Sequence, residues 1–186
     1  MRVIAGTAKG RRLVAVAPGV RPVSDRAREG VFSSLGGRVA GAHVLDLYAG
    51  TGAMGIEALS RGADRATFVD RARPATAAIG RNLEKTGFEE LAEVVRESVD
   101  SFLMREEVPG APFDLVILDP PYRTPSAEVE RALSLAAGVL DPTDWTVVLS
   151  RGARTSTHVV PLNWVAARRL EYGDSLVTLF RPARRP

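Results

Sequence analysis

From residue 43 onward, apolar runs typical of buried strands alternate with runs typical of helices. We expect strands at 43–48, 65–70, 93–98, 113–118 and 145–150, separated by helices at 53–62, 73–88, 101–107 and 126–140. Two β-rich runs around Gly173 and Asp174 predict an antiparallel hairpin within residues 163–181. This alternation is typical of an α/β fold, in which a mainly parallel sheet carries helices on both faces and ends in an antiparallel pair.

The first 37 residues follow a different pattern. Residues 2–6 and 11–17 are short β-branched runs on either side of a basic turn, which predicts a β-hairpin. Residues 21–37 then predict a helix that stops at two glycines. We therefore expect residues 1–37 to form a small hairpin-plus-helix extension of a domain that spans residues 38–186.

The composition excludes several kinds of chemistry. The 186 residues contain no cysteine, so disulfides, thiolate catalysis and cysteine-based metal centres are ruled out. The two histidines, His43 and His158, are too few for a histidine-built metal site, and we expect no metal. The N-terminus lacks the apolar core of a signal peptide, and no run approaches the ~18 apolar residues of a membrane span. We expect a cytoplasmic protein.

The positive charge is concentrated at the N-terminus. Seven basic and two acidic residues give residues 1–30 a net charge of +5, against +3 for the whole chain. A basic arm of this kind suits a nucleic-acid backbone. The residues that we expect to contact phosphates are Lys9, Arg11, Arg12 and Arg21.

A glycine-rich loop follows the strand at 43–48. Gly50, Gly52 and Gly55 stand in a G-x-G-x-x-G frame that opens a helix, and Asp70 ends the next expected strand. Taken literally, this is the fingerprint of a dinucleotide cofactor, with the acid on a ribose diol. S-adenosylmethionine carries the same diol, so the loop alone does not separate the two cofactors.

Two features favour S-adenosylmethionine. Asp46 ends the first strand, where it would face a pyrophosphate unfavourably but could hold the ammonium of a methionine. The residues after the loop are all needed to complete one sheet, which leaves no second domain for a hydride substrate. The end of the third strand should then lie beside the adenine, with Ser98 or Asp100 as acceptor and the Val99 backbone as donor. The remaining expected cofactor contacts are Ala49, Thr51 and Arg71.

The sequence "FDLVILDPPYRT" ends an apolar strand in a rigid polar turn. The two prolines have a fixed φ and no N–H, so the turn is pre-organised and offers free carbonyls. An exocyclic amino group could donate to the Asp119 carboxylate and the Pro120 carbonyl while Tyr122 stacks on the base. This arrangement predicts a clamp for an amino nitrogen that is to be methylated, and Asp119 could also accept the released proton.

The pairing of "DLYAGTG" with "DPPY" resembles the Rossmann-like amino-methyltransferases that use S-adenosylmethionine. Within that class the chain resembles the RsmD family of bacterial 16S rRNA guanine-N2 methyltransferases. The likeness extends over "RVIAGTAKGRRL", "RPVSDRAREGVF", "DLYAGTGAMGIEALSRGA" and "FDLVILDPPYR". The N-terminal segments discriminate, because DPPY also occurs in adenine-N6 and cytosine-N4 enzymes.

The resemblance implies a seven-stranded sheet, an N-terminal hairpin that grips RNA, and methylation of one guanine of 16S rRNA. The substrate would be the small ribosomal subunit or an assembly intermediate. By position, Asp46, Gly50, Gly52 and Asp70 would hold the cofactor, and Asp119, Pro120 and Tyr122 the guanine. Relatives often have an Asp-Ala or Asn-Ala pair where this chain has Ser98-Val99, which is a departure at the adenine contact.

Three other functions remain open at this point. An adenine-N6 methyltransferase shares the DPPY turn, although the chain has no room for a target-recognition insert. A nicotinamide-dependent oxidoreductase is consistent with the literal G-x-G-x-x-G frame. A nucleic-acid-binding module without a cofactor would account for the basic arm alone. We expect a monomer, since no conspicuous apolar segment remains after the sheet is assigned.

Overall fold

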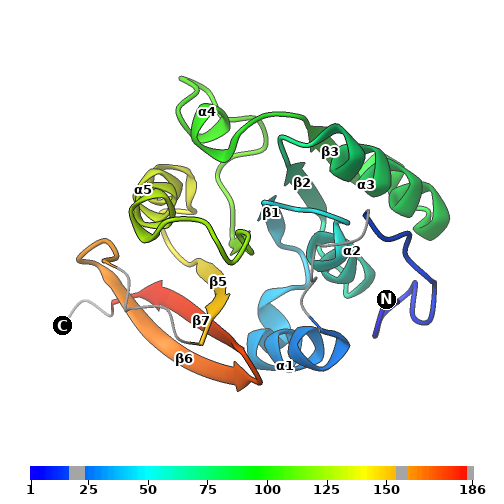
Figure 1. Cartoon of the computed structure of the whole chain (residues 1–186), viewed down its shortest axis with the longest axis horizontal. Helices are drawn as coiled ribbons and strands as arrows, with labels where there is room; N and C mark the ends of the chain where they lie inside the picture. Colours follow the sequence, from blue (N-terminus) through cyan, green and yellow to red (C-terminus); the bar gives the residue numbers. More distant parts are fainter. Residues whose placement is uncertain (17–23, 154–158, 184–186) are drawn as a thin grey trace.

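The computed structural model describes residues 1–16, 24–153 and 159–183. One seven-stranded sheet runs through it in the order β3-β2-β1-β4-β5-β7-β6 (Figure 1). The first five strands in this order are parallel, and β7 and β6 close the sheet as an antiparallel pair. The strands are β1 (His43–Leu47), β2 (Arg65–Val69), β3 (Ala92–Val95), β4 (Leu115–Leu118), β5 (Thr146–Gly152), β6 (Trp164–Tyr172) and β7 (Ser175–Pro182).

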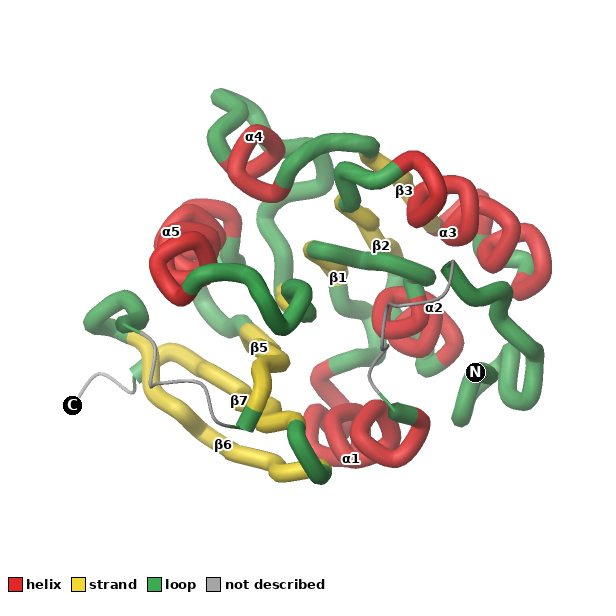
Figure 2. Tube along the Cα trace, viewed as in Figure 1, coloured by secondary structure: helices red, strands yellow, loops and turns green. Residues whose placement is uncertain are grey.

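Helices cover both faces of the sheet (Figure 2). They are α1 (Asp25–Leu35), α2 (Ala53–Ser60), α3 (Arg73–Thr86), α4 (Val99–Leu103) and α5 (Ser126–Ala136), with short 3-10 helices at Gly36–Arg38, Glu89–Leu91 and Ala137–Val139. Side chains of α1, α2 and α3 share one buried cluster with Val44 of β1, whereas α4 and α5 share the other with Leu45. This division follows from the two-residue period of a strand, which sends alternate side chains to opposite faces.

The expected α/β class is confirmed, and the differences are local. The strand expected at 93–98 ends at Val95, and the helix expected at 101–107 is α4, which ends at Leu103. The helix begins earlier than expected, at Val99, because the Ser98 hydroxyl accepts from the Ser101 N–H at 3.1 Å and caps α4. The expected C-terminal hairpin is confirmed as β6 and β7, which turn at Gly173 with φ of 57°.

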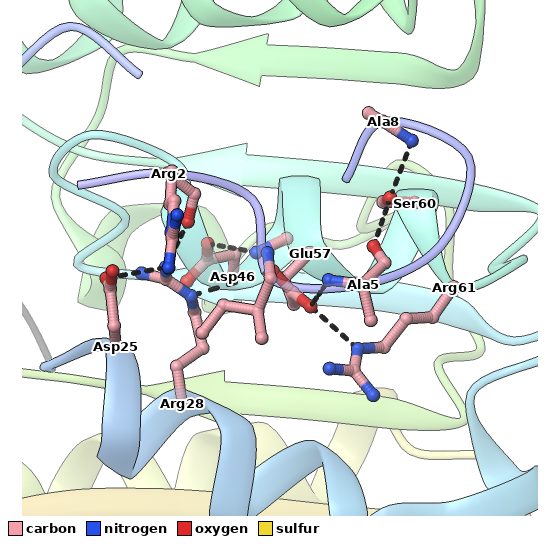
Figure 3. Close-up of polar contacts among 11 residues, drawn as sticks. Arg2, Ala5, Ala8, Asp25, Arg28, Asp46, Glu57, Ser60 and Arg61 are labelled. Atoms are coloured by element: carbon pink, nitrogen blue, oxygen red, sulfur yellow. Dashed lines mark hydrogen bonds and ion pairs between the residues drawn. The ribbon is translucent and has the colours of Figure 1, made fainter. Parts of the chain in front are cut away.

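The expected N-terminal hairpin is reduced to a single antiparallel bridge between Arg2 and Arg12. Around this bridge the Val3 N–H donates to the Arg11 carbonyl at 3.0 Å and the Gly10 N–H to the Val3 carbonyl at 2.9 Å. The backbone between these paired ends bonds to α2 (Figure 3). The Glu57 carboxylate accepts from the N–H groups of Ile4 and Ala5 at 2.8 and 3.1 Å. The Ser60 hydroxyl accepts from the backbone of the same segment farther along.

Packing joins this segment to the sheet. Val3, Ala8 and Leu13 are buried in the same cluster as side chains of α1, α2 and β1. The two stretches share one hydrophobic core. The division into an extension of residues 1–37 and a domain of residues 38–186 stays a prediction. Within the described ranges, no helix is both long and apolar enough to cross a bilayer.

Candidate active site

Three acidic residues come together at the carboxyl edge of the parallel strands. Leu47 of β1 pairs with Val69 of β2 and with Leu118 of β4. The next residue of each strand therefore lies at the same level, which brings Asp70 and Asp119 to either side of the turn that leaves β1. Ligands of open α/β sheets bind at this edge.

The turn after β1 is strained and glycine-dependent. Tyr48 has φ of 58°, in the left-handed region that non-glycine residues seldom adopt, and Gly50 and Gly52 have φ of 56° and 74°. The Gly50 N–H donates to the Asp70 carboxylate at 2.9 Å, which ties the loop to β2. The second Asp70 oxygen accepts from the Ala72 N–H at 2.8 Å. Asp70 was expected to bind a ribose diol of the cofactor. In the structure its carboxylate also holds the glycine loop in place.

Asp46 lies under this loop and is 1% exposed. Its carboxyl accepts from the Gly55 N–H at 2.9 Å, in the first turn of α2. The pKa of Asp46 is raised to about 8, mainly by burial. The hydrogen bond from Gly55 lowers this pKa in part, and the charges of Asp119 and Asp70 raise it. A cation placed beside Asp46 would be strongly favoured, because it would stabilise the ionised form.

Asp119 follows β4 and is partly exposed. Burial raises the pKa of Asp119 to about 6, and the Ser150 hydroxyl of β5 lowers it in part. Pro120 is buried. Within the described ranges we find no hydrogen bond to its carbonyl, whereas the Pro121 carbonyl accepts from the Thr124 N–H at 2.9 Å. The two acceptors of the expected clamp are therefore not engaged by backbone donors.

Arg151, at the end of β5, holds the turn that follows β4 by hydrogen bonds to two of its carbonyls. Its side chain is 5% exposed. The guanidinium donates to the Thr124 carbonyl at 2.8 Å and to the Pro121 carbonyl at 3.5 Å. Sequence reasoning missed Arg151, and its position directly after an apolar strand was the one available signal.

Tyr122 is half-exposed, as an aromatic platform for a base requires. Its hydroxyl is 2.6 Å from the hydroxyl of Ser175, the first residue of β7. This bond fixes the direction of the ring from the C-terminal hairpin. Ser175 was also missed, because a serine next to a hairpin turn is ordinarily explained by the turn itself.

At the end of the third strand, both side chains expected to accept from the adenine, Ser98 and Asp100, have other partners. The Ser98 hydroxyl is used to cap α4 and also lies 2.7 Å from the Ser101 hydroxyl. Asp100 pairs with Arg131 at 2.8 Å. The Val99 N–H opens α4, where helix geometry supplies no backbone partner, and it remains the expected donor to an adenine.

The basic residues of the arm lie on a different part of the molecule. Lys9 and Arg12 are exposed. The Arg11 guanidinium donates to the Lys85 carbonyl at 2.5 Å, where it caps the C-terminal end of α3. Arg21 lies outside the described residues.

A groove of about 730 Å³ lies at the opposite edge of the sheet. Its lining includes His43, Arg65 and Asp114, which stand at the amino ends of β1, β2 and β4. It is therefore separate from the strand ends that carry Asp46, Asp70 and Asp119.

Comparison with known proteins assigns the chain to a family. The family model described as "Conserved hypothetical protein 95" matches residues 1–181. Ribosomal RNA small subunit methyltransferase D of Escherichia coli is 33% identical over 97% of this chain and 89% of its own. The Haemophilus influenzae protein of that name is 32% identical over 93% and 89%. The solved structure of the "Putative methyltransferase yhhF" of Escherichia coli superposes with a TM-score of 0.86 at 31% identity, covering 99% of both chains. The chain belongs to the RsmD family.

Proposed function

We propose that this protein transfers a methyl group from S-adenosylmethionine to the exocyclic N2 of one guanine in 16S ribosomal RNA. The observation that carries the proposal is the pair of acceptors at Asp119 and Pro120, to which no backbone donor of the described residues is bonded, beside the half-exposed ring of Tyr122. The names of the relatives, which are small-subunit rRNA methyltransferases, support the reaction class and the kind of RNA.

The residues of the glycine loop fit the cofactor. A Cβ at Gly50 would meet nothing nearer than the Tyr48 carbonyl at 3.9 Å, so the loop backbone can be approached closely from that side. The buried carboxyl of Asp46 suits the cationic amino-acid end of the cofactor, and Asp70 suits the ribose diol. Ala49, Thr51 and Arg71 would flank it, with Ser98 and Val99 near the adenine. When bound, S-adenosylmethionine supplies an electrophilic methyl group on a positively charged sulfur.

The turn after β4 would orient the target nitrogen. The two N–H bonds of a guanine amino group would donate to the Asp119 carboxylate and the Pro120 carbonyl, with Tyr122 stacked on the base. An amino nitrogen conjugated to a base is a poor nucleophile, so orientation is the main contribution, worth at most roughly 7–11 kcal/mol. The nitrogen gains the methyl group and loses one proton, which the Asp119 carboxylate can accept.

RNA contact is proposed for Lys9, Arg12 and Arg21, and for Arg11 in addition to its bond with α3. The substrate would be the small ribosomal subunit or an assembly intermediate, and the enzyme a cytoplasmic monomer. Replacing Arg11 and Arg12 by Ala should weaken RNA binding. It should also lower the slope of the logarithm of affinity against the logarithm of salt concentration by about 2, the loss of two phosphate contacts. An unchanged salt slope would show that the arm does not touch the backbone.

The decisive experiment uses radiolabelled S-adenosylmethionine and small subunits from a strain that lacks its own guanine-N2 enzyme. After incubation, the RNA is digested and the labelled nucleoside is identified. Label in N2-methylguanosine is the expected result. Label in N6-methyladenosine would support the runner-up, an adenine methyltransferase, and would discard the guanine assignment.

A thermal-shift control addresses the remaining alternatives. S-adenosylhomocysteine should raise the melting temperature and NADH should not, since only a true ligand stabilises the folded state by mass action. A shift with NADH alone would support an oxidoreductase.

A further inference from the structure

Asn82 of α3 joins the glycine loop to the N-terminal segment. Its side chain is fully buried. The Nδ2 group donates to the Thr51 carbonyl in the glycine loop at 2.9 Å and to the Val14 carbonyl at 3.1 Å. The Oδ1 atom accepts from the Val14 N–H at 2.6 Å. One carboxamide therefore bonds to two segments that, within the described residues, do not bond to each other directly.

The three bonds demand a carboxamide. The site needs one acceptor and two donors, which is the inventory of an Asn side chain. Asp offers no donor when ionised, and Ala offers neither kind of group. Because all three backbone partners are fixed, the orientation of the amide is determined by its own network.

The bond to Thr51 completes the set of contacts that hold the loop. The Gly50 N–H donates to Asp70, the residue after β2, and the Gly52 N–H bonds to the Ala49 carbonyl at 2.7 Å. Asn82 adds an anchor on α3, from the side on which the N-terminal segment lies. Loss of this anchor would leave the Thr51 carbonyl buried without a partner and would widen the range of loop positions.

We propose that Asn82 is a positioning residue for the cofactor loop and makes the geometry of that loop depend on the seating of Val14. The proposal rests on the proposed cofactor. It implies that Asn82, which touches no reacting atom, sets cofactor affinity through Thr51. It also implies that displacement of Val14 weakens cofactor binding, because the freed amide no longer has a fixed orientation.

The test compares Asn82→Ala with Ser60→Ala. Ser60 holds a different part of the N-terminal segment, since its hydroxyl accepts from the Ala8 N–H at 3.0 Å and donates to the Ala5 carbonyl at 2.6 Å. Among the described residues its side chain has no bond to the loop or to Val14. Calorimetric titration with S-adenosylhomocysteine should give a Kd about 10–100-fold higher for Asn82→Ala. The Kd of Ser60→Ala should stay within about twofold of the Kd of the unchanged protein, even if the two variants lose the same amount of Tm.

Amide hydrogen exchange gives a second readout that needs no ligand. Exchange at Gly50 and Gly52 should be faster in Asn82→Ala and unchanged in Ser60→Ala. If Asn82→Ala does not fold, the isosteric Asn82→Asp replaces it, with the same expected results. An unchanged Kd with unchanged exchange in a folded Asn82 variant, or an equal loss in Ser60→Ala, would overturn the proposal. Failure of the unchanged protein to bind S-adenosylhomocysteine would instead overturn the proposed function.

Discussion

The buried guanidinium of Arg151 donates to the Thr124 carbonyl at 2.8 Å, so the end of β5 supports the turn that follows β4. Asp119, Pro120 and Tyr122 all belong to this turn, between the end of β4 and Thr124. A rigid turn is valuable here because the proposed role of Asp119 and Pro120 is orientation.

Replacement of Arg151 should therefore reduce catalysis more than cofactor binding. In Arg151→Met we expect kcat to fall about 10–100-fold, because a small displacement of the acceptors misaligns the target nitrogen. The Kd for S-adenosylhomocysteine should change little. Arg168→Met is the matched control, since Arg168 bonds to Ser34 of α1 and not to the turn. An unaltered kcat in a folded Arg151→Met would refute the supporting role.

The Tyr122–Ser175 hydroxyl pair should behave as a unit. Tyr122→Phe and Ser175→Ala each remove the same 2.6 Å bond, so each should lower kcat/KM for RNA by a few fold. The double variant should lose little more than either single one, because the bond can be lost only once. Steady-state kinetics on all four proteins checks this, and strictly additive losses would mean that the two side chains act independently.

Activity should depend on the ionisation of Asp119. With a pKa of about 6, the carboxylate is the major form at neutral pH, and kcat/KM should fall about tenfold per pH unit below pH 6. Asp119→Ala should abolish transfer while cofactor binding is largely kept. Ser150→Ala should move the acid limb to higher pH, since the Ser150 hydroxyl lowers this pKa. A profile without a limb between pH 5 and 7 in the unchanged protein would contradict the assignment.

Stability of the ligand-free protein should fall as pH rises because of Asp46. Its pKa of about 8 in the folded state lies above the value of about 4 expected when unfolded. The folded state therefore binds the Asp46 proton more tightly than the unfolded state does. The stability that this proton contributes is complete below about pH 4 and is lost as the pH rises to about 8. Asp46→Asn should raise Tm relative to the unchanged protein by a margin that grows over this range and levels off above it.

Gly6 should be required for the docking of the N-terminal segment on α2. It has φ of 83°, and a Cβ would lie 1.6 Å from the Ser60 carbonyl oxygen. Gly10 has φ of 85° but open space around it. Gly10→Ala should thus cost only the left-handed strain of about 1–2 kcal/mol, and Gly6→Ala clearly more. Urea unfolding of both variants measures the difference, and equal losses would show that the close contact can relax.

Much of the candidate site could be predicted from residues that follow apolar runs. Asp46, Asp70 and Asp119 were identified because parallel strands end at one edge, so acids at strand ends gather there whatever the details of packing. The fold class followed from the same alternation of strands and helices. In the N-terminal segment the same reasoning was less successful, since the β-branched pattern predicted a hairpin where one bridge forms.

The sequence by itself determined the sheet, the glycine loop and the chemistry of the strand ends, because these depend on short-range periodicity and turn residues. Only the tertiary structure decided which side chains support them. Asn82 meets Val14 across 68 positions, Tyr122 meets Ser175 across 53, and Arg151 meets Thr124 across 27. Polar pairs of this kind leave no local pattern, since their partners are backbone groups or small hydroxyls brought within reach by the packing of helices and strands.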